Sequence, residues 1–138
     1  MYIIIVGAGP LGVRLGQLAI DDGHNVVLIE ENESRARRGL TELNAQILRA
    51  DIDEEGILEE AKIGRADALI ATSEDDRTNL MAVALAKVAG LERLIAVVNN
   101  PSNREVFARL EVATLPDPHR VIAERLFHFL QRPETDEA

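Results

Sequence analysis

The sequence predicts a doubly wound α/β fold, with about six strands in a Rossmann-like parallel sheet and helices on both faces. Short apolar runs rich in β-branched residues alternate with segments of helical periodicity along the chain. A glycine-rich loop follows the first apolar run, and an acidic residue ends the second. The length of 138 residues suits one domain. We place that domain at 1–131 and a polar C-terminal tail at 132–138.

The first strand, helix and second strand form one unit. Residues 2–6 are an apolar run that ends at glycine, as expected of a strand buried on both faces of a parallel sheet. Leucines then recur at helical spacing from Leu11 to Leu18, and Gly23 closes this pattern before the next apolar run at 26–29. The whole unit takes about 30 residues, the usual length of a strand–helix–strand unit.

The same alternation continues to the C-terminus. Leu80, Val83 and Val88 share one face of a helical segment that Gly90 ends, and an apolar strand follows it. We expect further helices at 33–43, 54–61, 75–89, 102–110 and 117–131, and further strands at 46–49, 68–71, 94–98 and 112–115.

Composition excludes several classes of protein. With 46% hydrophobic and 28% charged residues, the chain can build an ordinary core. The net charge of −9 repels phosphate backbones and anionic lipids, so we do not expect nucleic-acid binding. The absence of cysteine rules out disulfides, thiolate metal sites and cysteine catalysis. Neither a signal peptide nor an apolar span of about 20 residues is evident, which indicates a soluble cytoplasmic protein.

A G-x-G-x-x-G motif stands between the first strand and the first helix. Gly7 permits a tight turn, Gly9 lets a pyrophosphate approach the backbone, and Gly12 lets helix and strand pack closely. The helix N-terminus adds free N–H groups and the positive end of its dipole. Pro10 has no N–H to donate, so neighbours such as Leu11 must supply the donors. The candidate phosphate-binding residues are Gly7, Ala8, Gly9, Pro10, Leu11 and Gly12.

Glu30 ends the second strand, where a carboxylate can accept hydrogen bonds from ribose hydroxyls. The same charge repels a 2′-phosphate and disfavours NADP, although Arg35 could soften that preference. Alternatively, the glycines mark only a tight turn and Glu30 is a solvated strand end. The ordered succession of strand, loop, helix, strand and acid favours nucleotide binding.

The residues of a catalytic site are missing, so we expect no enzymatic activity. The single tyrosine, Tyr2, opens the first strand, so the Tyr-x-x-x-Lys pair of short-chain dehydrogenases is absent. His24, His119 and His128 are expected at the surface or in packing contacts.

A group of carboxylates follows the third strand and could be read as a divalent-metal site. Carboxylates in a first helical turn also complement the helix dipole, and the later ones would face solvent, so we expect no metal. The group comprises Asp51, Asp53, Glu54, Glu55, Glu59 and Glu60.

Several segments together resemble the N-terminal domain of TrkA-type proteins, the regulator-of-potassium-conductance (RCK) family. Residues 50–53 stand where that family often has Gly-Asp-Ala-Thr, and 66–71 match the strand that follows. Residues 72–80 are similar to the family's strand-end threonine and Asp-Asp-x-x-Asn stretch, and 97–101 to its Arg-x-Asn-x-Pro region. The likeness spans nearly the whole chain.

The resemblance implies a cytoplasmic regulatory domain that senses NAD(H), ATP or ADP, with AMP as a further candidate. It would lie at the inner face of the cell membrane, held non-covalently by a potassium transporter that it gates. By this analogy Gly7, Gly9, Leu11 and Gly12 hold phosphates, Glu30 holds the adenosine ribose, and Asp51 and Ile52 lie beside the adenine.

Three more candidates, Thr72, Ser73 and Asn79, follow at the carboxyl end of the fourth strand, the side where such sheets bind ligands. Each also has a structural alternative. Ser73 can cap the next helix, and Asn79 can brace the loop.

The chain departs from the family pattern in three places. Ala50 replaces the usual glycine, which adds a methyl group where backbone approaches the ligand. Ala96 and Val97 stand where relatives carry arginine, which puts one phosphate contact in doubt. The family's C-terminal ligand domain is also absent, and both a natural single-domain protein and an excised fragment fit.

The resemblance further implies a homo-oligomer, a dimer or a ring, in which nucleotide binding biases two states. The apolar run at 80–86 is either an association surface or a core helix. The last helix is the better candidate, with Val121, Ile122, Leu126, Phe127, Phe129 and Leu130. Two other classes stay open: the cofactor module of an NAD-dependent oxidoreductase that lacks its substrate domain, and a structural adaptor with an empty site.

Overall fold

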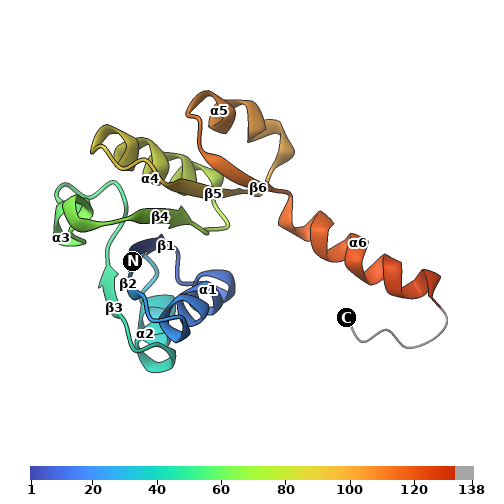
Figure 1. Ribbon diagram of the computed structural model, residues 1–138, viewed down its shortest axis with the longest axis horizontal. Helices are drawn as coiled ribbons and strands as arrows, with labels where there is room; N and C mark the ends of the chain where they lie inside the picture. Colours follow the sequence, from blue (N-terminus) through green and yellow to red (C-terminus); the bar gives the residue numbers. More distant parts are fainter. Residues whose placement is uncertain (133–138) are drawn as a thin grey trace.

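Six parallel strands form one sheet in the computed structural model, which describes residues 1–132 (Figure 1). The strand order is β3-β2-β1-β4-β5-β6, so the chain reverses its direction of winding between β1 and β4. The strands are β1 (Tyr2–Val6), β2 (Asn25–Glu30), β3 (Gln46–Arg49), β4 (Ala68–Ala71), β5 (Leu94–Val98) and β6 (Ala113–Pro116). The predicted doubly wound fold is confirmed.

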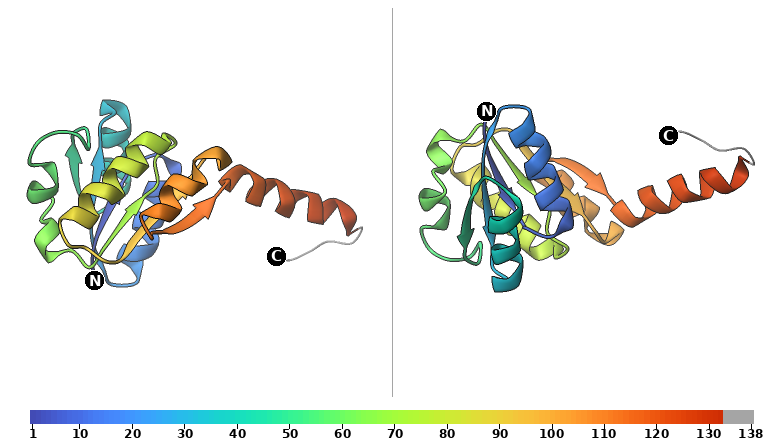
Figure 2. Two further views of the ribbon diagram at one scale, coloured as in Figure 1. Left: turned by 90° about the horizontal axis from the view of Figure 1, so that it is seen from above. Right: turned by 90° about the horizontal axis from the view of Figure 1, so that it is seen from below.

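Helices cover both faces of the sheet. Figure 2 shows α1 and α2 over one face and α3, α4 and α5 over the other. The helices of the described chain are α1 (Pro10–Asp21), α2 (Glu33–Glu42), α3 (Ile57–Glu60), α4 (Asp76–Val88), α5 (Arg104–Arg109) and α6 (Pro118–Gln131), and two 3₁₀ turns are η1 (Ile63–Arg65) and η2 (Pro101–Asn103).

Two predicted helices differ from the structure. The helix expected at 54–61 is only the single turn α3, because Gly56 precedes it with a left-handed φ of 83° that interrupts helical geometry. The helix expected at 102–110 starts as the 3₁₀ turn η2 and becomes α-helical at Arg104. The last strand is shifted by one residue, to Ala113–Pro116.

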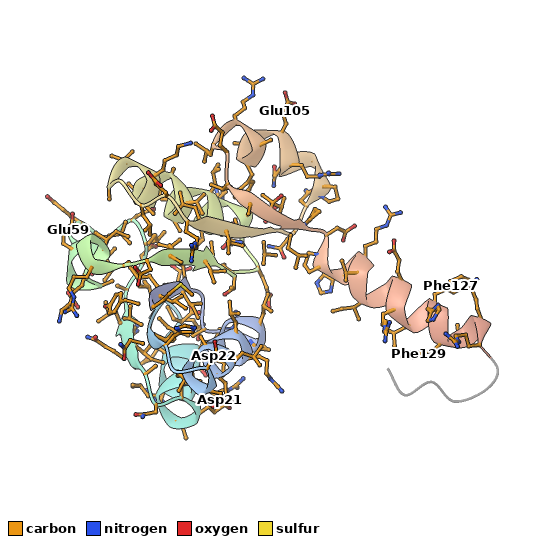
Figure 3. All side chains as sticks on the ribbon, viewed as in Figure 1. Asp21, Asp22, Glu59, Glu105, Phe127 and Phe129 are labelled. Atoms are coloured by element: carbon orange, nitrogen blue, oxygen red, sulfur yellow. The ribbon has the colours of Figure 1, made fainter. Side chains whose placement is uncertain are left out.

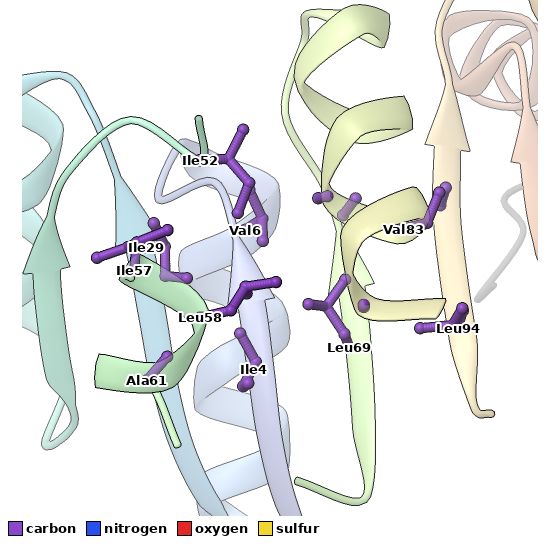
Figure 4. Packing of buried hydrophobic residues seen from close by; sticks show 14 of the residues in the cluster. Ile4, Val6, Ile29, Ile52, Ile57, Leu58, Ala61, Leu69, Val83 and Leu94 are labelled. Carbon is purple, nitrogen blue, oxygen red and sulfur yellow. The ribbon is translucent and has the colours of Figure 1, made fainter. Parts of the chain in front are cut away.

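The core has two layers because successive side chains of a strand point to opposite faces. Ile4 and Val6 of β1 belong to the larger layer, which packs under α3, α4 and α5 and is partly shown in Figure 4. Ile3 and Ile5 belong to the smaller layer under α1 and α2. Both faces of the central strands are therefore apolar, which explains their continuous apolar sequence.

Helix α6 extends away from the sheet (Figure 1), and Figure 3 shows Phe127 and Phe129 on this projecting part. None of its residues is buried. Through residue 132, no helix has both the length and the apolar character that crossing a membrane requires. Apart from Arg132, the predicted tail at 132–138 lies outside the described residues, and the division of the chain at 131 stays a prediction.

Candidate functional site

The glycine-rich loop has the geometry that its sequence predicts. Gly7 has a φ of 110°, which side chains rarely allow, and a Cβ there would lie 2.9 Å from Oγ1 of Thr72. A Cβ on Gly12 would lie only 1.9 Å from the carbonyl oxygen of Gly7. Gly9 is different, because its φ is −74° and a Cβ there would meet only the side chain of Arg35. Gly7 and Gly12 are thus needed by the fold, whereas one face of Gly9 is covered by the Arg35 side chain alone.

Helix α1 begins directly at this loop. Gly9 is its N-cap, no side chain caps it, Pro10 starts it, and its first turn contains no acidic residue. The N–H groups of a first helical turn have no partner within the helix, and the dipole makes this end positive. The loop and helix start therefore present a site suited to an anion.

Glu30 connects β2 to the loop. Its Oε1 accepts a hydrogen bond from the backbone N–H of Ala8 at 2.7 Å, and its Oε2 accepts one from Asn32 at 2.8 Å. The residue is only 8% exposed, so the alternative of a solvated strand end is wrong. Since two carboxylate oxygens offer about four acceptor positions, Glu30 keeps capacity for ribose hydroxyls while it holds the loop.

Thr72 and Asn79 brace the end of β4. The Thr72 hydroxyl donates to the carbonyl of Gly7 at 3.2 Å. Asn79 is 0% exposed; its Nδ2 donates to the carbonyls of Ser73 and Val97 at 2.8 and 2.9 Å, and its Oδ1 accepts from the Ser73 N–H at 2.9 Å. The structural alternative for Asn79 therefore describes what its side chain does here.

Ser73 does not cap the helix that follows it, so that alternative is wrong. The N-cap of α4 is Asp75, whose side chain accepts a hydrogen bond from the N–H of Arg77 at 2.9 Å. The Ser73 hydroxyl instead accepts from the Asp75 N–H at 3.0 Å. Asp75 is the better cap because it lies immediately before the first helical residue, where its carboxylate meets unpaired N–H groups.

Asp76 lies in the Asp-Asp-x-x-Asn stretch but is not among the predicted site residues. Its carboxylate accepts hydrogen bonds from the N–H groups of Asn99 and Asn100 at 2.7 and 2.9 Å and from the side chain of Asn103 at 2.9 Å. Partial burial acts to raise the pKa of Asp76, but these hydrogen bonds outweigh it and lower the pKa below its usual value. The available signal was Asp75-Asp76 after one strand and Asn99-Asn100 after the next.

A crevice runs along the carboxyl ends of the strands, where the winding reverses. At its middle lies a cavity of about 20 Å³, too small for a nucleoside. Predicted site residues from four different segments meet there. Its lining includes Gly7, Glu30, Ala50, Ile52 and Ser73.

On the β2–β3 side the crevice widens into a hollow of about 470 Å³, here called the acidic hollow. It is lined by Glu31, Asp51, Ile52, Asp53, Asp75, Arg77, Thr78 and Met81. A hydrogen bond with the Asp51 carboxyl and the charge of Asp51 raise the pKa of Glu31, with smaller contributions from burial and from Glu30 and Asp75. The hollow is therefore unfavourable for an additional negative charge.

On the other side lies a mainly apolar hollow of about 460 Å³, here called the apolar hollow. Helix α6 contributes to it through its first turns, a contribution that the sequence pattern does not predict. The lining residues are Gly9, Pro10, Leu11, Arg35, Thr72, Ser73, Glu74, Val97, Asn99, Leu115, Pro118, His119, Val121 and Ile122.

The crevice brings together most of the predicted binding residues. Gly7 and Glu30 line the small cavity, and Asp51 and Ile52 line the acidic hollow. Ser73 borders both the small cavity and the apolar hollow, and the apolar hollow is also lined by Gly9, Pro10, Leu11 and Thr72. Asn79 lies beneath the surface. Within residues 1–132, no group of three or more acidic or histidine side chains is arranged to hold a metal ion.

The family model and the curated relatives indicate one family. Residues 3–118 match the model of the TrkA-N domain. The Trk system potassium uptake protein TrkA homolog of Methanothermobacter thermautotrophicus is 34% identical over 134 residues, which are 97% of this chain and 62% of that protein. The chain thus spans less than two thirds of this relative.

Two solved structures show the same fold. The Kef C-terminal domain of Shewanella denitrificans, in AMP-bound form, has a TM-score of 0.78 at 17% identity, covering 98% of this chain and 84% of that one. A GsuK channel bound to NAD has a TM-score of 0.73 at 18% identity, covering 83% of this chain and 21% of that one.

Proposed function

The chain belongs to the TrkA-N domain family, and we propose that it is a nucleotide-sensing regulatory domain of a potassium uptake system. Its ligand is NAD(H), ATP or ADP, with AMP as a further candidate. The observation that carries this proposal is the crevice: an uncapped helix start at Gly9, with the buried Glu30 carboxylate hydrogen-bonded to the neighbouring N–H of Ala8. These groups match the phosphate and ribose of a nucleotide.

The two hollows support a ligand that lies across the glycine loop. The phosphates sit at the start of α1, adenosine extends into the acidic hollow, and the rest of a dinucleotide fills the apolar hollow. The structural relatives bound to NAD and to AMP have the same fold. A mononucleotide would leave the apolar hollow empty.

The charges around the ribose site favour NAD over NADP. A 2′-phosphate would lie near Glu30 and near the Glu31–Asp51 pair, where carboxylates already repel one another. Bringing another anion there costs Coulomb energy that an unphosphorylated ribose avoids. We expect NADP to bind more weakly than NAD.

The partner we propose is a membrane potassium transporter, because the curated relative is named as part of a Trk potassium uptake system. The domain would sit in the cytoplasm at the inner face of the membrane. A homo-oligomer, a dimer or a ring of dimers, would carry the signal: nucleotide binding favours one of two arrangements of neighbouring subunits, and that arrangement acts on the transporter.

Helix α6 supports self-association. An isolated helix of its length is marginally stable in water, and α6 buries none of its residues against the sheet. Its apolar side chains are instead exposed, namely Val121, Ile122, Leu126, Phe127, Phe129 and Leu130. A second subunit of the same chain would cover this surface.

The proposal involves binding and no chemical reaction. One observation favours the alternative of an oxidoreductase cofactor module: His119 lines the apolar hollow, where the reactive ring of a dinucleotide would lie. Reduction of NAD by a small substrate, abolished by His119→Ala, would establish that alternative.

Calorimetric titration of NAD, NADH, ATP, ADP, AMP and NADP tests the binding proposal. The key variant is Gly9→Ala, which fits the backbone but adds a methyl group on the face that a phosphate approaches. The matched control is Gly64→Ala, where a Cβ meets nothing within 4 Å. We expect binding that Gly9→Ala weakens and Gly64→Ala retains. No binding of any nucleotide would overturn the proposal and favour a structural adaptor.

A genetic test addresses the potassium uptake system itself. Deletion of the gene should impair growth on limiting potassium, and the wild-type gene should restore growth where the Gly9→Ala gene does not. Unimpaired growth after the deletion would contradict the proposed role.

A further inference from the structure

The Arg35 side chain lies across the glycine loop at Gly9. A Cβ built on Gly9 would be 2.9 Å from Nη1 of Arg35, so the guanidinium rests directly against this glycine. Its other terminal nitrogen, Nη2, is 3.3 Å from Oε1 of Glu74, in the loop between β4 and α4. The pair thus bridges the crevice from α2 to the far side.

The position of Arg35 is set by the same contacts that hold the loop. Asn32 donates its N–H to Glu30, and its side chain accepts the N–H of Arg35 at 2.9 Å as the N-cap of α2. The start of α2 is therefore attached to the centre of the crevice. This attachment holds the backbone of Arg35 beside the crevice, and from there its side chain reaches Gly9.

The Arg35–Glu74 ion pair is suited to an exchange in which a phosphate replaces the Glu74 carboxylate. The two side chains are 38% and 74% exposed, and ion pairs exposed to this degree contribute little to stability. A guanidinium binds a phosphate through two parallel charge-assisted hydrogen bonds, a stronger arrangement than one exposed contact with a carboxylate. A phosphate at the start of α1 would approach the face of Gly9 that Arg35 now occupies.

We propose that Arg35 is a phosphate-binding residue whose guanidinium is paired with Glu74 when no nucleotide is bound. A nucleotide's phosphate displaces the Glu74 carboxylate and binds the guanidinium in its place. This inference rests on the proposed function, since it concerns the same crevice. The ligand class it selects is a nucleotide with a diphosphate or pyrophosphate, because such a group can contact the helix start and Arg35 together. The pair also borders the apolar hollow, so its opening would clear the entrance to that side.

Titration of ADP and adenosine into four proteins tests the exchange: the wild type, Arg35→Ala, Glu74→Gln and the double variant. Arg35→Ala should weaken ADP binding about tenfold or more. Glu74→Gln should tighten ADP binding, because Arg35 is then free for the phosphate. In the Arg35→Ala background the Glu74→Gln change should have a much smaller effect, since no pair remains to be broken. Adenosine, which lacks phosphate, should bind all four alike.

The pair Arg37–Glu33 is the matched control. Both of its residues lie on α2, the helix that carries Arg35. The distance from Arg37 Nη2 to Glu33 Oε1 is 3.2 Å, close to that of the Arg35–Glu74 pair, but the Arg37–Glu33 pair does not span the crevice. Arg37→Ala and Glu33→Gln should leave ADP binding within about twofold of the wild type. An effect equal to that of Arg35→Ala would show that net charge alone is responsible, and it would overturn the exchange.

The remaining outcomes are distinct. If Arg35→Ala binds ADP as tightly as the wild type, the exchange is overturned but the proposed function is not. The same holds if Glu74→Gln binds ADP more weakly than the wild type. Binding by Glu74→Gln alone supports the exchange and shows that Glu74 keeps the wild-type crevice closed. If neither the wild type nor Glu74→Gln binds ADP, both the exchange and the ADP site are overturned.

Discussion

The Oε1 atom of Glu30 accepts a hydrogen bond from the backbone N–H of Ala8 at 2.7 Å, which joins the end of β2 to the glycine loop 22 residues earlier in the chain. A residue predicted to bind ribose is therefore also part of the loop's framework. Substitution of Glu30 must change the protein before any ligand is present.

We predict that Glu30→Ala lowers the free energy of unfolding by about 1–3 kcal/mol without ligand, because the N–H groups of Ala8 and Asn32 lose a largely buried acceptor. Urea denaturation followed by circular dichroism measures this. Glu33→Ala, which removes an exposed carboxylate, is the control. Equal stability of Glu30→Ala and the wild type would mean that the hydrogen bonds from Ala8 and Asn32 to Glu30 do not stabilise the fold.

Alanine should lower the stability of the fold at Gly12 and the affinity for nucleotide at Gly9. Gly12→Ala places a Cβ within 1.9 Å of the Gly7 carbonyl oxygen, so the loop must shift, and we expect a loss of about 1–3 kcal/mol in stability. Gly9→Ala meets only the flexible Arg35 side chain and should keep nearly full stability while nucleotide binding falls. Thermal denaturation and calorimetric titration separate the two effects, and the reverse order would contradict this reading of the loop.

Asp76 should make stability depend on pH. Hydrogen bonds lower the pKa of Asp76 in the folded protein, so its stabilising effect is present above the ordinary carboxyl pKa and is lost as pH falls through the lowered value. At neutral pH, Asp76→Asn should cost about 1–3 kcal/mol, because the N–H groups of Asn99 and Asn100 lose their charged acceptor.

The difference between the wild type and Asp76→Asn should shrink on acidification, since the variant does not titrate at this position. Urea denaturation at a series of pH values checks this, with the exposed Asp53→Asn as the control. A difference that is the same at every pH would rule out the Asp76 carboxylate as its source.

The exposed surface of α6 predicts association. Leu126 and Leu130 are 60% and 80% exposed, and replacing both by glutamate should convert an oligomer to a monomer while leaving the sheet folded. Leu18→Glu on α1, at a leucine that is 63% exposed, is the matched control. Sedimentation over a range of concentrations, with and without nucleotide, gives the answer; a wild-type monomer under all conditions would contradict the assembly.

The strands were predictable because each has a strong local cause. Strands β3, β4 and β5 lie at the expected residues, since a strand buried on both faces must be a short apolar run. The glycine loop was equally local, because φ and Cβ clearance at Gly7 and Gly12 are properties of one turn. Helix α3 was overestimated because the carboxylates before it are equally compatible with turns, and Gly56 decided between the two.

The sequence alone therefore determined the order of the elements, the winding of the sheet and the place of the crevice, all of which follow from periodicity and turn chemistry. Only the tertiary structure decided which polar side chains brace the fold and which remain available to a ligand. Asn79 donates its side-chain hydrogen bonds to backbone carbonyls at the ends of two strands, and Arg35 pairs with Glu74, 39 residues away in the chain. The contacts of Asn79 with Val97 and of Arg35 with Glu74 depend on packing between segments far apart in the chain, which no local pattern encodes.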